Sequence, residues 1–150
     1  MRYFELVTEA QTLHRRVWPL NDPTLAKAST ANALLEGEFL FVNDAYKLIR
    51  ASANSKGFAL FMEKGRYDVQ AVSGSRTTVL AGGAYEADTM IFTAAALTLG
   101  GDLGIDAAVD IGDSVTRSGL KNWASGPVIG FVTRLPANNG QKLRFFQTLV

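Results

Sequence analysis

Residues 57–83 read GFALFMEKGRYDVQAVSGSRTTVLAGG, and this stretch decides the fold class. Its glycines at positions 57, 65, 74, 82 and 83 divide it into segments of eight or nine residues. Each segment has room for one short strand and a turn, and Tyr67, Val69 and Ala71 alternate with polar residues as a half-buried strand does. The spacing therefore predicts an all-β domain.

The same rhythm continues on both sides of this stretch. The segment from Glu38 to Val42 is rich in β-forming residues, and the apolar run from Val128 to Val132 fits a central strand. Asn139-Gly140 favours a tight hairpin before the last strand. Further strands are expected at 46–51, 58–62, 67–71, 77–80, 85–92, 103–109, 114–116, 128–134 and 142–150, with a hairpin or bulge at Gly82-Gly83. About eight to ten short strands without long helices predict a small β-barrel or sandwich over residues 33–150.

Composition excludes several classes of protein. Hydrophobic residues make up 47% of the 150 residues and charged residues 19%, which indicates a folded chain of one domain. The net charge of +1 gives no field that would attract nucleic acid or an anionic membrane. There is no cysteine, and we find no signal peptide or membrane span. We expect a soluble protein that is made and assembled in a cytoplasm.

Residues 1–32 differ from the rest, because no glycine occurs before Gly37. The spacing of Tyr3, Leu6, Ala10, Leu13 and Val17 favours a short helix, although an edge strand is the alternative. The two prolines after Trp18 and Asp22 then favour an extended, irregular run from residue 18 to residue 32. We therefore predict an N-terminal arm, residues 1–32, outside the β domain.

The arm is too apolar to lie free in water. It either folds back over its own β domain or lies on a neighbouring subunit, where aromatic anchors concentrate binding energy. His14-Arg15-Arg16 is the densest basic cluster, but nearby acidic residues offset it and favour a salt-bridged face over nucleic acid binding. The candidate partner interface consists of Tyr3, Phe4, Leu6, Leu13, Arg15, Arg16, Val17, Trp18 and Leu20.

No motif carries a recognisable chemistry. Gly112-Asp113-Ser114 imitates a hydrolase nucleophile block, but the only histidine is His14, in the arm. Asp102, Asp106, Asp110 and Asp113 lie near glycines at a spacing that resembles a calcium repeat, yet only one copy is present, so they are interpreted as turn residues. We expect no catalytic, cofactor-binding or metal-binding residues, and no enzyme.

The aromatic side chains are interpreted as core by default, because they fall at strand spacing among apolar neighbours. This set comprises Phe39, Phe41, Phe58, Phe61, Tyr67, Phe92, Phe131, Phe145 and Phe146. Trp123 is different, since it lies in a polar, turn-rich loop. Trp123 or Tyr67 is the candidate platform if the protein binds a glycan.

The layout of the chain resembles that of the capsid decoration, or cement, proteins of tailed bacteriophages. The likeness covers residues 33–150. The segments that carry it are Ala33-Leu34-Leu35-Glu36-Gly37-Glu38-Phe39, Tyr85-Glu86-Ala87-Asp88-Thr89, Gly100-Gly101-Asp102-Leu103, Gly126-Pro127-Val128-Ile129-Gly130-Phe131-Val132 and Leu143-Arg144-Phe145-Phe146. The family has no invariant catalytic signature, so no site residues carry over.

This resemblance implies a small β-barrel or β-tulip with an extended N-terminal arm. It implies a structural virion protein on the outside of an expanded capsid. Its partners would be the major capsid protein and copies of itself, with a trimer preferred to a dimer. Such a clamp stabilises the lattice by mass action. The alternatives are a tail, neck or head-fibre component, and a particle-displayed glycan-binding domain.

Overall fold

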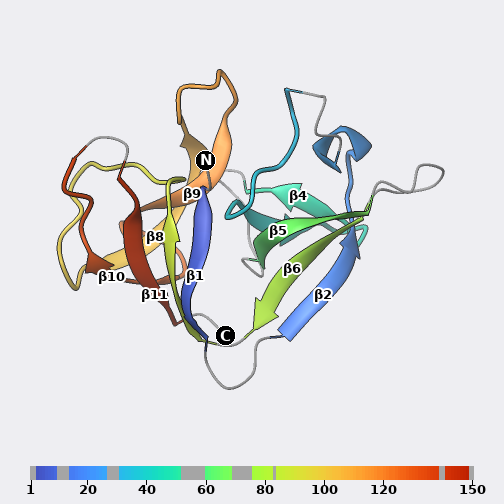
Figure 1. The fold of residues 1–150 in the computed structure, drawn as a ribbon. Helices are drawn as coiled ribbons and strands as arrows, with labels where there is room; N and C mark the ends of the chain where they lie inside the picture. The colour runs from blue at the N-terminus through green and yellow to red at the C-terminus, as the bar shows by residue number, and fades with distance from the viewer. Residues whose placement is uncertain are drawn as a thin grey trace.

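The computed structural model describes residues 3–9, 14–26, 31–51, 60–68, 76–82, 84–138 and 141–148. Its strands form two antiparallel sheets, which lie on opposite sides of the molecule in Figure 1. The six-stranded sheet has the order β1 (Phe4–Glu9), β7 (Tyr85–Thr89), β11 (Leu143–Gln147), β10 (Gly130–Arg134), β8 (Asp102–Val109), β9 (Arg117–Asn122). The five-stranded sheet has the order β2 (His14–Pro19), β6 (Arg76–Gly82), β5 (Leu60–Asp68), β3 (Phe39–Val42), β4 (Leu48–Arg50). One short 3-10 helix, η1 (Pro23–Ala26), follows β2.

The predicted small, mainly β domain is confirmed. In the described residues both sheets have a linear strand order, so the barrel alternative is wrong for this part of the chain. The main hydrophobic core joins the two sheets, because it combines Phe39, Phe41 and Leu80 with Leu103 and Phe145.

Strand β3 is buried on both of its faces. Phe39 and Phe41 enter the main core, whereas Leu40 points to a second cluster on the other face of the same sheet. Leu20 and Leu25, which flank the start of η1, cover that second cluster. A strand buried on both sides needs an unbroken apolar run, and this explains why Glu38–Val42 lacks polar alternation.

The expected helix is wrong for the described residues 3–9 and 14–17, and the edge-strand alternative is confirmed there, because β1 and β2 each lie at the edge of a sheet. Residues 4–9 form β1, which pairs with β7, and residues 14–19 form β2, which pairs with β6. Tertiary pairing overrides the helical spacing, since Phe4 and Leu6 contact the main core from one side of a strand. The boundary of an arm at residue 32 stays a prediction, although both strands belong to sheets built by the rest of the chain.

Gly37 shows how β1 packs against the segment that leads into β3. Its φ is +91°, and a Cβ at this position would lie 2.8 Å from the Cβ of Phe4. Any other residue would therefore suffer both an unfavourable backbone and a clash. The first glycine of the chain is thus the point at which the N-terminal strand packs.

Three strand predictions need correction. The strands expected at 58–62 and 67–71 are replaced by one strand, β5, with an irregular register between Met62 and Tyr67. Strands β6 and β7 belong to different sheets, so Gly82-Gly83 is not a hairpin. The strand expected at 114–116 is a loop. Strand β9 begins at Arg117, and its polar residues and Gly119 are not typical of a strand.

The Asn139-Gly140 turn lies outside the described residues, but β10 and β11 do pair as antiparallel neighbours.

Candidate binding sites

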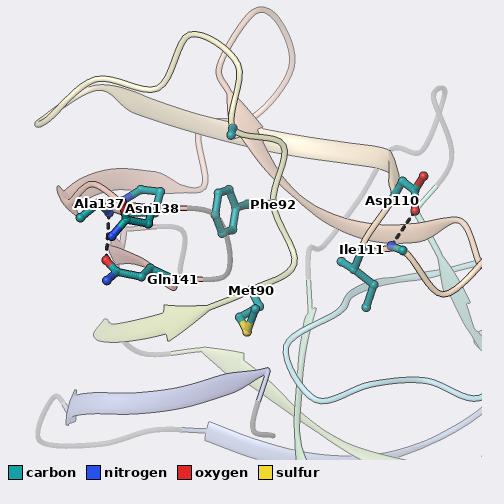
Figure 2. A pocket seen from close by; sticks show the side chains of 10 residues that line it. Met90, Phe92, Asp110, Ile111, Ala137, Asn138 and Gln141 are labelled. Carbon is teal, nitrogen blue, oxygen red and sulfur yellow. Dashed lines mark hydrogen bonds between the residues drawn. The ribbon is translucent and has the colours of Figure 1, made fainter.

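One open hollow of about 630 Å³ lies between the segment after β7, the loop after β8 and the loop between β10 and β11 (Figure 2). Met90, Phe92 and Ile111 supply apolar walls. Asp110 is the one ionisable residue in its lining, and its carboxylate accepts a hydrogen bond from the Gly112 amide at 2.8 Å. The described lining residues therefore include no acid and base pair, and their polar groups support local turns.

The carboxylate of Glu38 is fully buried and accepts several hydrogen bonds. Its Oε1 accepts from Arg50 Nε of β4 at 2.8 Å, and its Oε2 accepts from Arg117 Nη1 of β9 at 2.9 Å. The Leu35 amide donates to Oε2 at 2.7 Å. Because Arg50 and Arg117 come from different sheets, Glu38 ties the sheets together.

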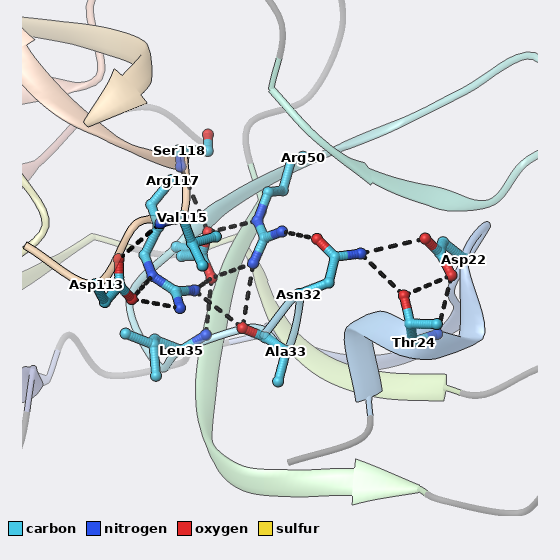
Figure 3. A network of polar contacts seen from close by, with 11 residues as sticks. Asp22, Thr24, Asn32, Ala33, Leu35, Arg50, Asp113, Val115, Arg117 and Ser118 are labelled. Atoms are coloured by element: carbon cyan, nitrogen blue, oxygen red, sulfur yellow. Dashed lines mark hydrogen bonds and ion pairs between the residues drawn. The ribbon is translucent and has the colours of Figure 1, made fainter. Parts of the chain in front are cut away.

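The network around Glu38 extends outward at both ends (Figure 3). On one side Arg50 donates to Asn32 Oδ1 at 2.7 Å, and Asn32 donates to Asp22. On the other side Arg117 Nη2 lies 2.7 Å from Asp113 Oδ2. Every charge in this chain of contacts has an opposite partner or hydrogen bonds, as a structural role requires.

Two carboxylates of this network have altered acidity. The Thr24 amide and hydroxyl donate to Asp22 and hold its pKa below the ordinary value. Partial burial acts to raise the pKa of Asp113, but the hydrogen bonds from Arg117 and the Val115 amide outweigh it, and the net pKa is lowered. Both groups are therefore stabilised as anions, unlike a proton donor poised near neutral pH.

Of the four aspartates interpreted as turn residues, Asp110 and Asp113 lie in loops, whereas Asp102 and Asp106 belong to β8, so the turn interpretation is wrong for these two. Asp106 accepts from the Ala108 amide at 2.9 Å, and Asp113 accepts from the Val115 amide at 3.2 Å. Ser114 lies in the loop before β9, which belongs to the six-stranded sheet. His14, the histidine that a serine nucleophile would need, begins β2 in the other sheet. Within the described residues, no group of three or more potential metal-ligating side chains gathers. In the same residues no helix has the length and apolar character to cross a bilayer.

Three described side chains of the predicted partner interface, Phe4, Leu6 and Leu20, contribute to the protein's own hydrophobic clusters. Phe4 and Leu20 are each only 2% exposed, in two different hydrophobic clusters. Leu6 packs on the main core, and Tyr3 and Trp18 are half-buried. Leu13 lies outside the described residues. Residues 15, 16 and 17 pair in register with Leu80, Val79 and Thr78. The side chains of Arg15, Arg16 and Val17 lie outside the described part of the structure.

Trp18 leads to an exposed aromatic residue that the sequence analysis missed. Its indole Nε1 donates to the backbone oxygen of Tyr46 at 2.7 Å. Tyr46 lies in the turn between β3 and β4, is 76% exposed and has a φ of +58°. The left-handed backbone costs a non-glycine residue roughly 1–2 kcal/mol, so glycine or asparagine is the usual choice there.

Asn43 makes this turn rigid. The Tyr46 amide donates to the Asn43 backbone oxygen at 2.9 Å, and the Asn43 side-chain oxygen accepts from the Ala45 and Lys47 amides, both at 3.0 Å. The Asn43 amide also donates to the Lys47 oxygen at 2.9 Å. The bonds to Asn43 therefore fix the turn that carries the exposed ring of Tyr46, whose backbone has an unfavourable left-handed conformation.

A second exposed aromatic set lies on the outer face of the six-stranded sheet. Phe131 is 36% exposed, so its interpretation as core is wrong, and its ring stacks on Phe146 with centroids 5.6 Å apart. Trp123, just after β9, is 39% exposed, as its loop position suggested. Phe39, Phe41 and Phe145 are core, as predicted. Alternation along β10 and β11 was the available signal, because Val132 and Phe145 point inward and force Phe131 and Phe146 outward.

No protein family model, curated protein or solved structure matches this chain.

Proposed function

We propose that the protein is a structural virion protein that binds the outside of an expanded phage capsid and cements neighbouring major capsid subunits. The proposal rests on the resemblance of residues 33–150 to capsid decoration proteins and on the small β domain that the chain forms. Assembly takes place in the host cytoplasm. Copies of the protein associate with one another on the capsid, with a trimer preferred to a dimer, and the protein binds neither nucleic acid nor membrane.

The observation that carries the proposal is the projecting ring of Tyr46. A tyrosine supplies a large contact area with little loss of side-chain freedom, and exposed tyrosines are enriched among residues that dominate protein interfaces. Its turn is fixed by Asn43, and Trp18 of the predicted interface holds the Tyr46 carbonyl. A rigid anchor loses little entropy on binding. We assign Tyr46 the role of inserting into a socket on the capsid surface.

The test is binding to cognate empty, expanded capsids, followed by electron microscopy. We expect ordered density at joints between capsid subunits, and a capsid that resists heat in proportion to the concentration of bound protein. Tyr46→Gly should weaken binding about 30-fold, the equivalent of about 2 kcal/mol for an interface anchor. Trp123→Ala, which removes an exposed aromatic residue from the other sheet, is the matched control and should bind normally.

Two results would count against this function. Density confined to the tail, the neck or head fibres would support the corresponding alternative. Full binding by Tyr46→Gly would leave capsid attachment possible but would remove Tyr46 as its anchor.

A further inference from the structure

The exposed aromatic residues of the six-stranded sheet form a row across neighbouring strands. Phe146 of β11 is the register partner of Phe131 of β10, and Phe131 is the partner of Asp102 of β8. The Trp123 amide donates to the Asp102 backbone oxygen at 3.0 Å, which places Trp123 beside the end of the row. We name Phe146, Phe131 and Trp123 the aromatic row, with Asp102 between Phe131 and Trp123.

Gly104 lets the indole of Trp123 lie close to the sheet. A Cβ built on Gly104 would be 3.4 Å from Trp123 Cδ1 and 3.6 Å from its Cα. The neighbours Leu103 and Ile105 point into or against the core, so Gly104 faces outward, on the same side as Asp102. The indole also donates to the Gly126 oxygen at 3.0 Å. Trp123 is therefore a fixed platform on the outer face.

Polar groups flank the row in balanced pairs. Asp88 accepts from Arg144 Nε at 2.8 Å and lies 3.4 Å from Arg134 Nη2. Glu86 is the register partner of Phe146, and Lys121 is the partner of Gly104. The acidic residues Glu86, Asp88 and Asp102 thus stand against the basic residues Lys121, Arg134 and Arg144. The row is lined with hydrogen-bonding groups but has little net charge.

We propose that the aromatic row binds an extended, uncharged polysaccharide. The C–H groups on one face of a pyranose carry partial positive charge and stack on the negative face of an aromatic ring. Neighbouring strands are about 4.8 Å apart. The rings of Phe146 and Phe131 lie on adjacent strands, and Trp123 lies beyond β8, so an extended sugar chain that crosses the strands would meet the two phenylalanines and then the indole. Paired carboxylates and guanidinium groups can bind hydroxyl groups, and their balanced charge is complementary to a neutral ligand.

This site is independent of capsid attachment through Tyr46, because Tyr46 lies in the turn between β3 and β4 of the five-stranded sheet. A protein attached to a particle by one sheet would leave the other available for surface glycans. The two activities are therefore separable by mutation.

Affinity electrophoresis of the full chain tests the proposal, with hydroxyethylcellulose, mixed-linkage β-glucan, galactomannan and dextran as neutral probes and alginate as a charged one. We expect at least one neutral polysaccharide to retard the protein, and Trp123→Ala to weaken that binding about tenfold, or about 1.4 kcal/mol. Trp123→Phe keeps a stacking ring and should retain most of the binding. Tyr46→Gly should bind as the wild type does, and circular dichroism confirms that each variant is folded.

Three outcomes would overturn the proposal. These are no retardation by any neutral probe, retardation by alginate alone, and equal retardation of wild type and Trp123→Ala. If Phe131→Ala or Trp123→Ala instead loses capsid binding, the row is a protein interface and the glycan assignment is wrong.

Discussion

The two sheets expose aromatic side chains in opposite ways. In the five-stranded sheet, Tyr46 projects from a turn whose backbone is unfavourable for tyrosine. In the six-stranded sheet, Phe131 and Phe146 lie on regular paired strands, where outward side chains follow from strand alternation. The first arrangement has a cost in stability and suits a socket in a folded partner. The second has no backbone cost and suits a flat ligand.

This contrast teaches that exposure alone does not identify a site. Tyr46 is informative because a glycine would satisfy its backbone better. The aromatic row is informative because several rings share one face with hydrogen-bonding groups. In both cases the geometry around the ring carries the inference.

The largest expected effect comes from breaking the connection between the sheets. Glu38→Ala leaves the guanidinium groups of Arg50 and Arg117 without their buried partner, so we expect the free energy of unfolding to fall by about 3–5 kcal/mol. Urea unfolding followed by circular dichroism measures this change. Asp44→Ala, in the exposed turn, is the control and should change stability by less than about 0.5 kcal/mol. A similar small effect for both variants would mean that Glu38 does not hold the sheets together.

A smaller effect of opposite sign is expected at Tyr46. Tyr46→Gly relieves the left-handed backbone, and after the greater chain entropy of glycine the net gain in stability should be about 0.5–1 kcal/mol. Thermal unfolding should show a raised Tm, while capsid binding is weakened. Tyr46→Ala keeps the backbone strain and serves as the comparison. A lowered Tm for Tyr46→Gly would show that the ring stabilises the turn, and would weaken its assignment as an anchor.

The smallest expected effect is on acid stability. The pKa of Asp113 is lowered in the folded protein, so its contribution to stability is present above its unfolded pKa of about 3.9 and is lost as pH falls through the folded value. Asp113→Asn should therefore flatten the fall in Tm between about pH 4 and pH 2. The Tm of this variant should still fall somewhat with pH, because the pKa of Asp22 is also lowered in the folded protein. An unchanged acid profile would contradict the bond to Arg117.

Much of the fold was predictable because local chemistry specifies strands and turns. Gly37 and the apolar run after it correctly marked the entry into β3. The run Val128–Val132 overlaps β10, which lies inside its sheet, although Phe131 faces outward. The N-terminal residues were not predictable in this way. Their spacing fits a helix locally, and only pairing with β7 and β6, far along the chain, makes them strands.

The candidate sites followed the same division. Trp123 stood out in the sequence because a large aromatic residue lay among turn formers. Tyr46 gave no such signal, since its left-handed conformation arises from hydrogen bonds to Asn43. Glu38 also looked like an ordinary strand-edge carboxylate, although the fold buries it between two arginines that are 12 and 79 residues away.

The sequence by itself determined a cysteine-free, nearly neutral β domain, because composition, glycine spacing and alternation act over a few residues. The tertiary structure decided the division into two sheets, the insertion of the N-terminal strands, the burial of Glu38 and the alignment of Phe146, Phe131 and Trp123. These features depend on contacts between residues far apart in the chain. A pattern that extends over a few residues does not indicate which distant strands become neighbours.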